Sequence, residues 1–206
     1  MEQKMFCYQC EQTAGCTGCT GSRGVCGKTA QTAQLQDELT GALIGLARAT
    51  IGDTLATEET WNVMITGLFA TLTNVSFDDA AIREQISAVH RAKDALVPQC
   101  QSCGRNDDYD LRQLWEEPDE DIRSLKSLIL FGLRGMAAYA YHAMVLGYRD
   151  AAIDTFFSEA LCKVGETFPM EELLQTALKV GEVNLQCMAL LDKANTETFG
   201  TPSPKT

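Results

Sequence analysis

Five of the chain's nine cysteines lie within positions 7–26, in a segment that is also rich in glycine. Glycine recurs there at every third position: Gly15, Gly18, Gly21, Gly24 and Gly27. This spacing matches neither the period of a helix nor the alternation of a strand. We therefore expect residues 1–28 to form a cysteine-rich loop.

The chain shows no signal for export to an oxidising compartment. Residues 1–4 lead directly into Phe6 and Cys7 and lack the basic, apolar and small-residue regions of a signal peptide. Disulfides are rare in the cytosol, and an odd number of cysteines fits a disulfide framework poorly. We expect a cytoplasmic protein whose clustered cysteines bind a metal.

The strongest element of the loop is the pair formed by Cys7 and Cys10, which are separated by two residues. This spacing lets both thiolates reach one metal centre from a single turn. Two further ligands must come from the other three cysteines of the loop: Cys16, Cys19 and Cys26.

The sequence favours an iron–sulfur cluster in this loop. Zinc is one alternative, but only five residues separate the two C-x2-C pairs, and structural zinc sites usually place about a dozen there. A cluster tolerates wider and irregular spacing, and the backbone N–H groups of the glycine-rich loop stabilise its negative charge. Arg23 and Lys28 add positive charge nearby. Zinc, and cysteines without any metal, stay open as alternatives.

The acidic charge of the chain excludes some classes of partner. The formal net charge is −11, of which residues 1–28 carry +1 and the other 178 residues carry −12. Nucleic acids and anionic membranes select basic faces, so we expect neither as a partner. The longest apolar candidate for a membrane span, residues 128–147, is interrupted by Arg134 and His142.

Apolar residues at three- and four-residue spacing predict six helices in the remainder of the chain. The first starts near Thr29, and Thr57 caps the second. Ser76 and Asp79 have the spacing of a capping box for the third. The last three follow three helix-initiating residues: Pro118, Asp150 and Pro169.

No segment predicts a strand, so we expect an all-α fold built as two three-helix bundles. The first bundle covers residues 29–97 and the second covers residues 118–197. A polar connector, residues 98–117, separates them, and residues 198–206 form a tail without periodicity.

Several segments of the chain resemble one known family. Residues 5–14, Gly18-Cys19 and residues 25–28 resemble the amino terminus of hybrid cluster proteins, also called the prismane or hydroxylamine reductase family. Residues 29–39 resemble the first helix of that family. Residues 181–200 resemble the end of its helical first domain, so the resemblance covers almost the whole chain.

The resemblance implies a ligand set for the loop. In the family, four amino-terminal cysteines bind a [4Fe-4S] cluster, or a [2Fe-2S] cluster in some members. The corresponding residues here are Cys7, Cys10, Cys19 and Cys26, and Cys16 is an extra thiol. Six residues separate the last two ligands, as in the two-iron class, but the short gap between the second and third favours the [4Fe-4S] cluster.

The resemblance also implies a function. Family members are longer and continue into α/β domains that hold the hybrid cluster, where hydroxylamine is reduced. We expect the 206 residues to be the electron-transfer domain, to receive electrons from a redox partner protein and to lack catalysis by themselves. The alternative is a helical interaction or scaffold module, either stabilised by zinc or free of metal.

The remaining cysteines and histidines do not form a second predicted site. Cys100 and Cys103 repeat the C-x2-C spacing but have no evident second pair of ligands, so we interpret them as reduced thiols. Cys162 and Cys187 fall on helical stripes and are expected to be small core residues. His90 and His142 lack a helical ligand partner and are expected to have structural or surface roles.

Overall fold

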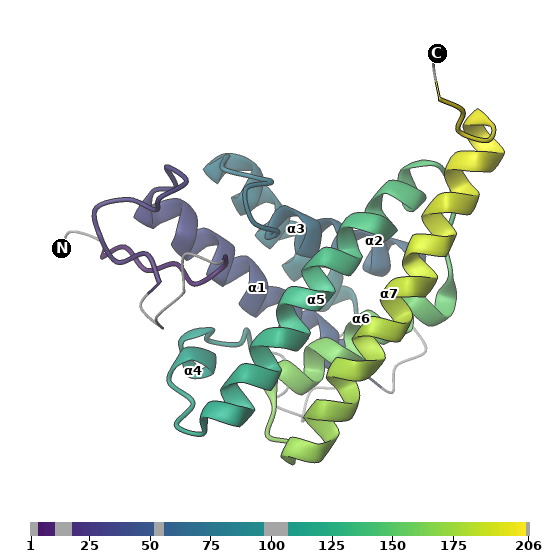
Figure 1. The fold of residues 1–206 in the computed structure, drawn as a ribbon. Helices are drawn as coiled ribbons and strands as arrows, with labels where there is room; N and C mark the ends of the chain where they lie inside the picture. Colours follow the sequence, from purple (N-terminus) through teal and green to yellow (C-terminus); the bar gives the residue numbers. More distant parts are fainter. Residues whose placement is uncertain (1–3, 11–17, 52–55, 97–106, 205–206) are drawn as a thin grey trace.

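The computed structural model describes residues 4–10, 18–51, 56–96 and 107–204. The described part is all-α, as predicted, and contains no strand, only an isolated bridge in the amino-terminal loop. Its helices are listed here with their bounds: α1 (Ala30–Thr50), α2 (Glu58–Ala70), α3 (Asp79–Leu96), α4 (Arg112–Trp115), α5 (Glu120–Val145), α6 (Ala151–Gly165) and α7 (Met170–Phe199). Figure 1 shows the amino-terminal loop beside α1 and the carboxyl terminus on the opposite side of the view.

Side-chain caps fix where several helices begin. The hydroxyl of Thr29 accepts a hydrogen bond from the Thr32 N–H at 3.1 Å, and Thr57 and Thr60 form a reciprocal capping box at the start of α2. Asp119 and Asp150 accept N–H groups of the first turns of α5 and α6. These caps satisfy backbone donors that have no partner inside the helix.

Three helix predictions need correction. The connector contains a short helix, α4, that its polar sequence did not predict. Asp78, not Ser76, caps α3, because its carboxylate accepts the Ala80 and Ala81 N–H groups at 2.9 and 3.1 Å. Helix α7 continues to Phe199, two residues into the predicted tail, and ends before Gly200, where φ is +84°.

The helices share one continuous hydrophobic core. Helix α1 packs against α3 and α6, and α5 packs against α2 and lies along α7 (Figure 1). Helices from both halves of the chain therefore contribute to the same core, and the division into residues 29–97 and 118–197 stays a prediction. Of the described helices, α5 alone is long and apolar enough to cross a membrane, a test that core helices of soluble proteins also pass.

The segment before α4 packs closely against α1, and this contact positions Tyr109 beside the amino-terminal part of the fold. The Tyr109 N–H donates to the Gly41 carbonyl at 3.0 Å. A Cβ atom on Gly41 would lie 2.1 Å from the Tyr109 carbonyl oxygen, far inside van der Waals contact. Only glycine at position 41 therefore allows this segment to lie against α1.

This contact gives a prediction about stability. We expect Gly41→Ala to lower the free energy of unfolding by about 1–3 kcal/mol, the usual effect of overpacking. Gly135→Ala is the matched control, because a Cβ there meets no atom within 4 Å and alanine favours a helix interior by about 1 kcal/mol. Urea unfolding of both variants measures the difference, and equal effects would contradict the interpretation.

Candidate metal centre

The two halves of the cysteine loop meet at a backbone pair between Cys7 and Cys19. The Cys7 N–H donates to the Cys19 carbonyl at 3.1 Å, and the Cys19 N–H donates to the Cys7 carbonyl at 2.8 Å. Gly18 precedes the pair with φ of +60°, and a Cβ there would lie 2.8 Å from the Cys7 oxygen. Glycine thus permits a pairing that joins two predicted ligands.

A tight turn then presents Cys26. The Gly24 N–H donates to the Lys28 carbonyl at 2.8 Å, and the Gly27 N–H donates to the Gly24 carbonyl at 2.9 Å. Gly27 adopts φ of +90°, a conformation that glycine accepts without strain. The turn leaves Cys26 exposed and sends the Lys28 side chain inward, where it is buried.

The Lys28 ammonium links this loop to α1. With 3% of its surface exposed, Nζ donates to Gln36 Oε1 at 2.6 Å, Gln9 Oε1 at 3.3 Å and Cys7 Sγ at 3.6 Å. Gln36 in turn donates to the Ser76 carbonyl at 2.7 Å. One buried cation therefore contacts the sulfur of a predicted ligand and two amide oxygens.

A second buried cation, Arg134, comes from the middle of α5. Its Nε donates to the Thr71 hydroxyl at 3.2 Å, and its Nη2 donates to the Thr40 hydroxyl at 2.9 Å. Its Nη1 finds no hydrogen-bond partner in the described parts of the chain. Burial lowers the pKa of Arg134 to about 10, against the opposing charges of Asp37 and Cys7, so the side chain is cationic at neutral pH.

Asp37 is the carboxyl group that interacts electrostatically with both Lys28 and Arg134. It is partly buried on α1, and burial raises its pKa to about 6, although Arg134 and Lys28 act in the opposite direction. Burial also raises the pKa of the Cys7 thiol above its ordinary value, and again the charge of Lys28 opposes the shift. A metal bound at Cys7 must therefore displace a proton from this thiol.

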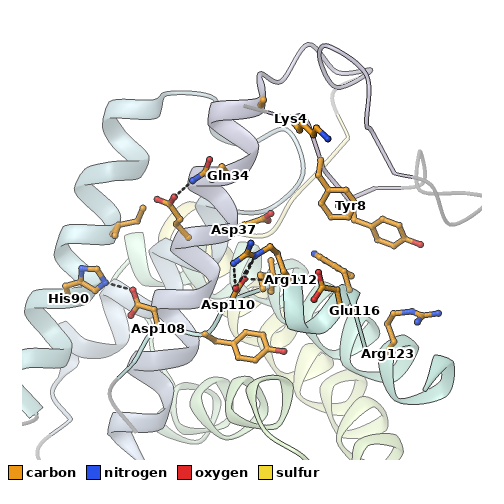
Figure 2. Close-up of a pocket in the computed structure, with 17 residues that line it drawn as sticks. Lys4, Tyr8, Gln34, Asp37, His90, Asp108, Asp110, Arg112, Glu116 and Arg123 are labelled. Atoms are coloured by element: carbon orange, nitrogen blue, oxygen red, sulfur yellow. Dashed lines mark hydrogen bonds and ion pairs between the residues drawn. The ribbon is translucent and has the colours of Figure 1, made fainter. Parts of the chain in front are cut away.

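A cleft of about 1100 Å³ lies beside the loop, bordered by α1, α3 and the segment around α4. Figure 2 shows Asp37 on its wall, with Tyr8 of the loop on one side and Arg112 of α4 on another. The rings of Tyr8 and Trp115 lie 4.9 Å apart and join the C-x2-C segment to α4. His90 and Asp108 line another side of the cleft, and His90 Nε2 lies 2.8 Å from Asp108 Oδ2.

The structure places the four predicted ligands in the same loop but does not test their role. Cys7, Cys10 and Cys19 are partly buried, and Cys26 is exposed. Within the described ranges, no three Cys, His, Asp or Glu side chains are grouped closely enough to hold one metal ion. A cluster of several irons separates its ligands more widely than one ion does, and four thiols are the donor set that such clusters use. The donor chemistry thus fits an iron–sulfur cluster.

The other cysteines and histidines follow the sequence predictions where the structure describes them. Cys162 and Cys187 are buried in the core, and burial raises the pKa of the Cys187 thiol to about 12. The ring of His142 packs edge-on against Phe69. The predictions about Cys16, Cys100 and Cys103 lie outside the described residues.

Sequence reasoning missed the charged groups around Cys7. Lys28 was identified only as a nearby charge, and Arg134 only as an interruption of an apolar run. A lone cation inside an apolar helical stripe is a usable signal, because a buried charge needs a partner. Asp37 gave no comparable signal, since a carboxylate between apolar positions of a helix is common on a solvated face.

Comparisons with known proteins agree with the resemblance. A family model described as the Prismane/CO dehydrogenase family matches residues 5–206. A hydroxylamine reductase of Porphyromonas gingivalis is 40% identical over 98% of this chain, and one of Thermodesulfovibrio yellowstonii is 40% identical over 97%. One from Methanocaldococcus jannaschii is 38% identical over 96%. The chain covers 41%, 41% and 40% of these relatives, or about two fifths of their length.

The raised pKa of Asp37 gives a prediction about pH. The unfolded carboxyl titrates near 3.8 and the folded one near 6, so the stability that its proton provides is complete below about pH 4 and is lost as the pH rises through 6. Asp37→Asn mimics the protonated form. At pH 7.5 we expect this variant, without metal, to melt at least about 2 °C above the unmodified chain.

Thermal unfolding between pH 4 and 8 measures this effect, and the gain should shrink toward zero at the acidic end. Glu38→Gln is the matched control, because Glu38 is the exposed neighbour of Asp37 on α1. A gain of equal size at every pH, or the same profile in both variants, would show that Asp37 is not the titrating group.

Proposed function

Because the chain belongs to the Prismane/CO dehydrogenase family, we propose that its amino-terminal loop holds an iron–sulfur cluster and passes electrons. The ligands are the four cysteines that match the family motif: Cys7, Cys10, Cys19 and Cys26. A [4Fe-4S] cluster is the proposed form, with [2Fe-2S] as its alternative. When bound, it supplies one-electron transfer.

The observation that carries this proposal is the backbone pairing of Cys7 with Cys19. It brings the C-x2-C segment beside the second half of the loop, where the other two cysteines lie. Lys28 supports the proposal, because its ammonium reaches the Cys7 sulfur at 3.6 Å. Hydrogen bonds to ligand sulfurs are a recurrent means of holding and tuning iron–sulfur centres.

The names of the relatives suggest which reaction the electrons support. The relatives are named hydroxylamine reductases, so we propose that residues 1–206 relay electrons to a reduction site in the remainder of a protein of their length. The electron donor in this proposal is a cytoplasmic redox protein. Neither nucleic acid nor a membrane has a role in it, in keeping with the net charge of −11.

Iron and acid-labile sulfide content per chain, measured after anaerobic purification, tests the proposal. We expect a brown protein with equal amounts of iron and sulfide and an electron paramagnetic resonance signal after reduction. A colourless chain that contains one zinc and no sulfide would overturn the proposal and favour a zinc-stabilised interaction module. A folded chain without metal would favour a scaffold.

Single substitutions test the ligand set. We expect cluster content to fall by at least about tenfold, the lower end of the range for outer-shell changes, in each of four variants: Cys7→Ser, Cys10→Ser, Cys19→Ser and Cys26→Ser. Cys16→Ser is the matched control from the same loop and should keep full iron content. If Cys16→Ser loses the cluster while Cys19→Ser retains it, the assignment of the third ligand is wrong.

We also expect the isolated 206-residue chain not to reduce hydroxylamine. One-electron transfer does not by itself provide the substrate-binding centre that cleavage of an N–O bond requires. Steady-state assays with a low-potential dye as the electron donor check this expectation. Sustained, reductant-dependent turnover by the loaded chain would contradict the assignment of a relay role.

A further inference from the structure

Two cations are buried beside the cysteine loop without a carboxylate to pair with. Lys28 and Arg134 are 3% and 2% exposed. Neither makes a salt bridge within 4.0 Å in the described parts of the chain. Their hydrogen-bond partners are uncharged side chains: Gln9, Gln36, Thr40, Thr71 and the Cys7 thiol. A buried charge is costly unless an opposite charge compensates it.

The local anions do not balance these charges in the metal-free chain. Asp37 is the carboxyl group that acts on both cations, and one carboxylate cannot neutralise two positive charges. Cys7 is the other group that acts on both, through the contact of its sulfur with Lys28 at 3.6 Å and, when it is a thiolate, through its charge at Arg134. A metal-bound cysteine is a thiolate and carries negative charge.

We propose that the two buried cations, Lys28 and Arg134, together compensate the negative charge of the iron–sulfur centre at Cys7 and raise its reduction potential. This inference rests on the proposed function. Reduction brings in one electron from an external donor, adds one negative charge and breaks no bond of the chain. Fixed positive charges in a region of low dielectric stabilise the more negative state.

The two cations act differently on the centre. Lys28 donates directly to the sulfur of one ligand, so it affects both the charge and the electron density at Cys7. Arg134 reaches the loop through charge alone, since its hydrogen bonds go to Thr40 on α1 and to Thr71 after α2. Those hydroxyls also donate to the Gln36 and Leu68 carbonyls, both at 2.8 Å. They therefore keep partners when Arg134 is replaced.

Redox titration of the loaded chain tests the proposal. We expect Lys28→Gln, which keeps amide donors but loses the charge, to shift the midpoint potential to more negative values and to alter the resonance signal of the reduced state. Lys28→Arg keeps the charge and should lie closer to the unmodified chain. Arg23→Gln is the matched control, because it removes an exposed positive charge from the same loop, where solvent screens it.

Arg134→Gln provides an independent second variant. We expect a more negative potential with a smaller change in the resonance signal, because this residue does not contact a ligand. An unchanged potential in both Lys28→Gln and Arg134→Gln would overturn the proposal, as would an equal shift in Arg23→Gln. Those results would leave Lys28 as a purely structural link between the loop and α1.

Loss of the cluster is also informative. If Lys28→Gln loses it while Lys28→Arg retains it, the charge is required and the proposal is supported. If both variants lose it, shape rather than charge governs retention, and the proposal fails for Lys28. An unmodified chain without iron would overturn the proposed function and this inference together. A loaded chain whose potential none of the substitutions changes would overturn the inference alone.

Discussion

The hydrogen bonds of the Lys28 ammonium hold the amino-terminal loop on the helical body. The loop has little apolar surface of its own to bury, and Met5 is its one buried large apolar side chain in the described part. Lys28 joins Gln36 on α1 to Gln9 and Cys7 in the loop. The Thr73 hydroxyl adds a bond to the Gln9 carbonyl at 2.5 Å. These polar contacts therefore fix the loop together with the packing of Tyr8 against Trp115.

The helical core holds the buried Arg134 guanidinium in a fixed position. Helices α1, α2 and α5 meet in a dense apolar cluster, and the Arg134 guanidinium is placed within it between two threonine hydroxyls. A rigid, low-dielectric surrounding strengthens every charge interaction inside it. The charge of Arg134 can thus act on the loop without touching it. In a solvated setting, water would screen the same charge.

Local patterns in the sequence predicted most of the helices but little of the charged site. Caps such as Thr57 and Asp150 act on residues a few positions away, so their effect is readable from sequence. The pairing of Cys7 with Cys19 and the bonds from Arg134 to Thr40 and Thr71 join residues that are distant in the chain. Those contacts follow from how helices pack, which spacing alone does not specify. Helix α4 was missed for a different reason, because its four residues are too few for a periodic signal.

The buried charges affect the free energy of the metal-free chain and of the metal-loaded chain in opposite directions. Without a negative centre in the loop, Lys28 and Arg134 are poorly compensated. Burial, meanwhile, raises the pKa of Asp37 to about 6. Binding of an anionic centre would relieve the first effect, because its charge offsets the cations, whereas the same negative charge acts on Asp37 as a like charge and favours its protonated form further. Free energy released in this way adds to metal affinity and to the stability of the loaded fold, since the centre binds the folded chain and not the unfolded one. The same charges that weaken the metal-free chain therefore favour retention of the centre and its reduced state.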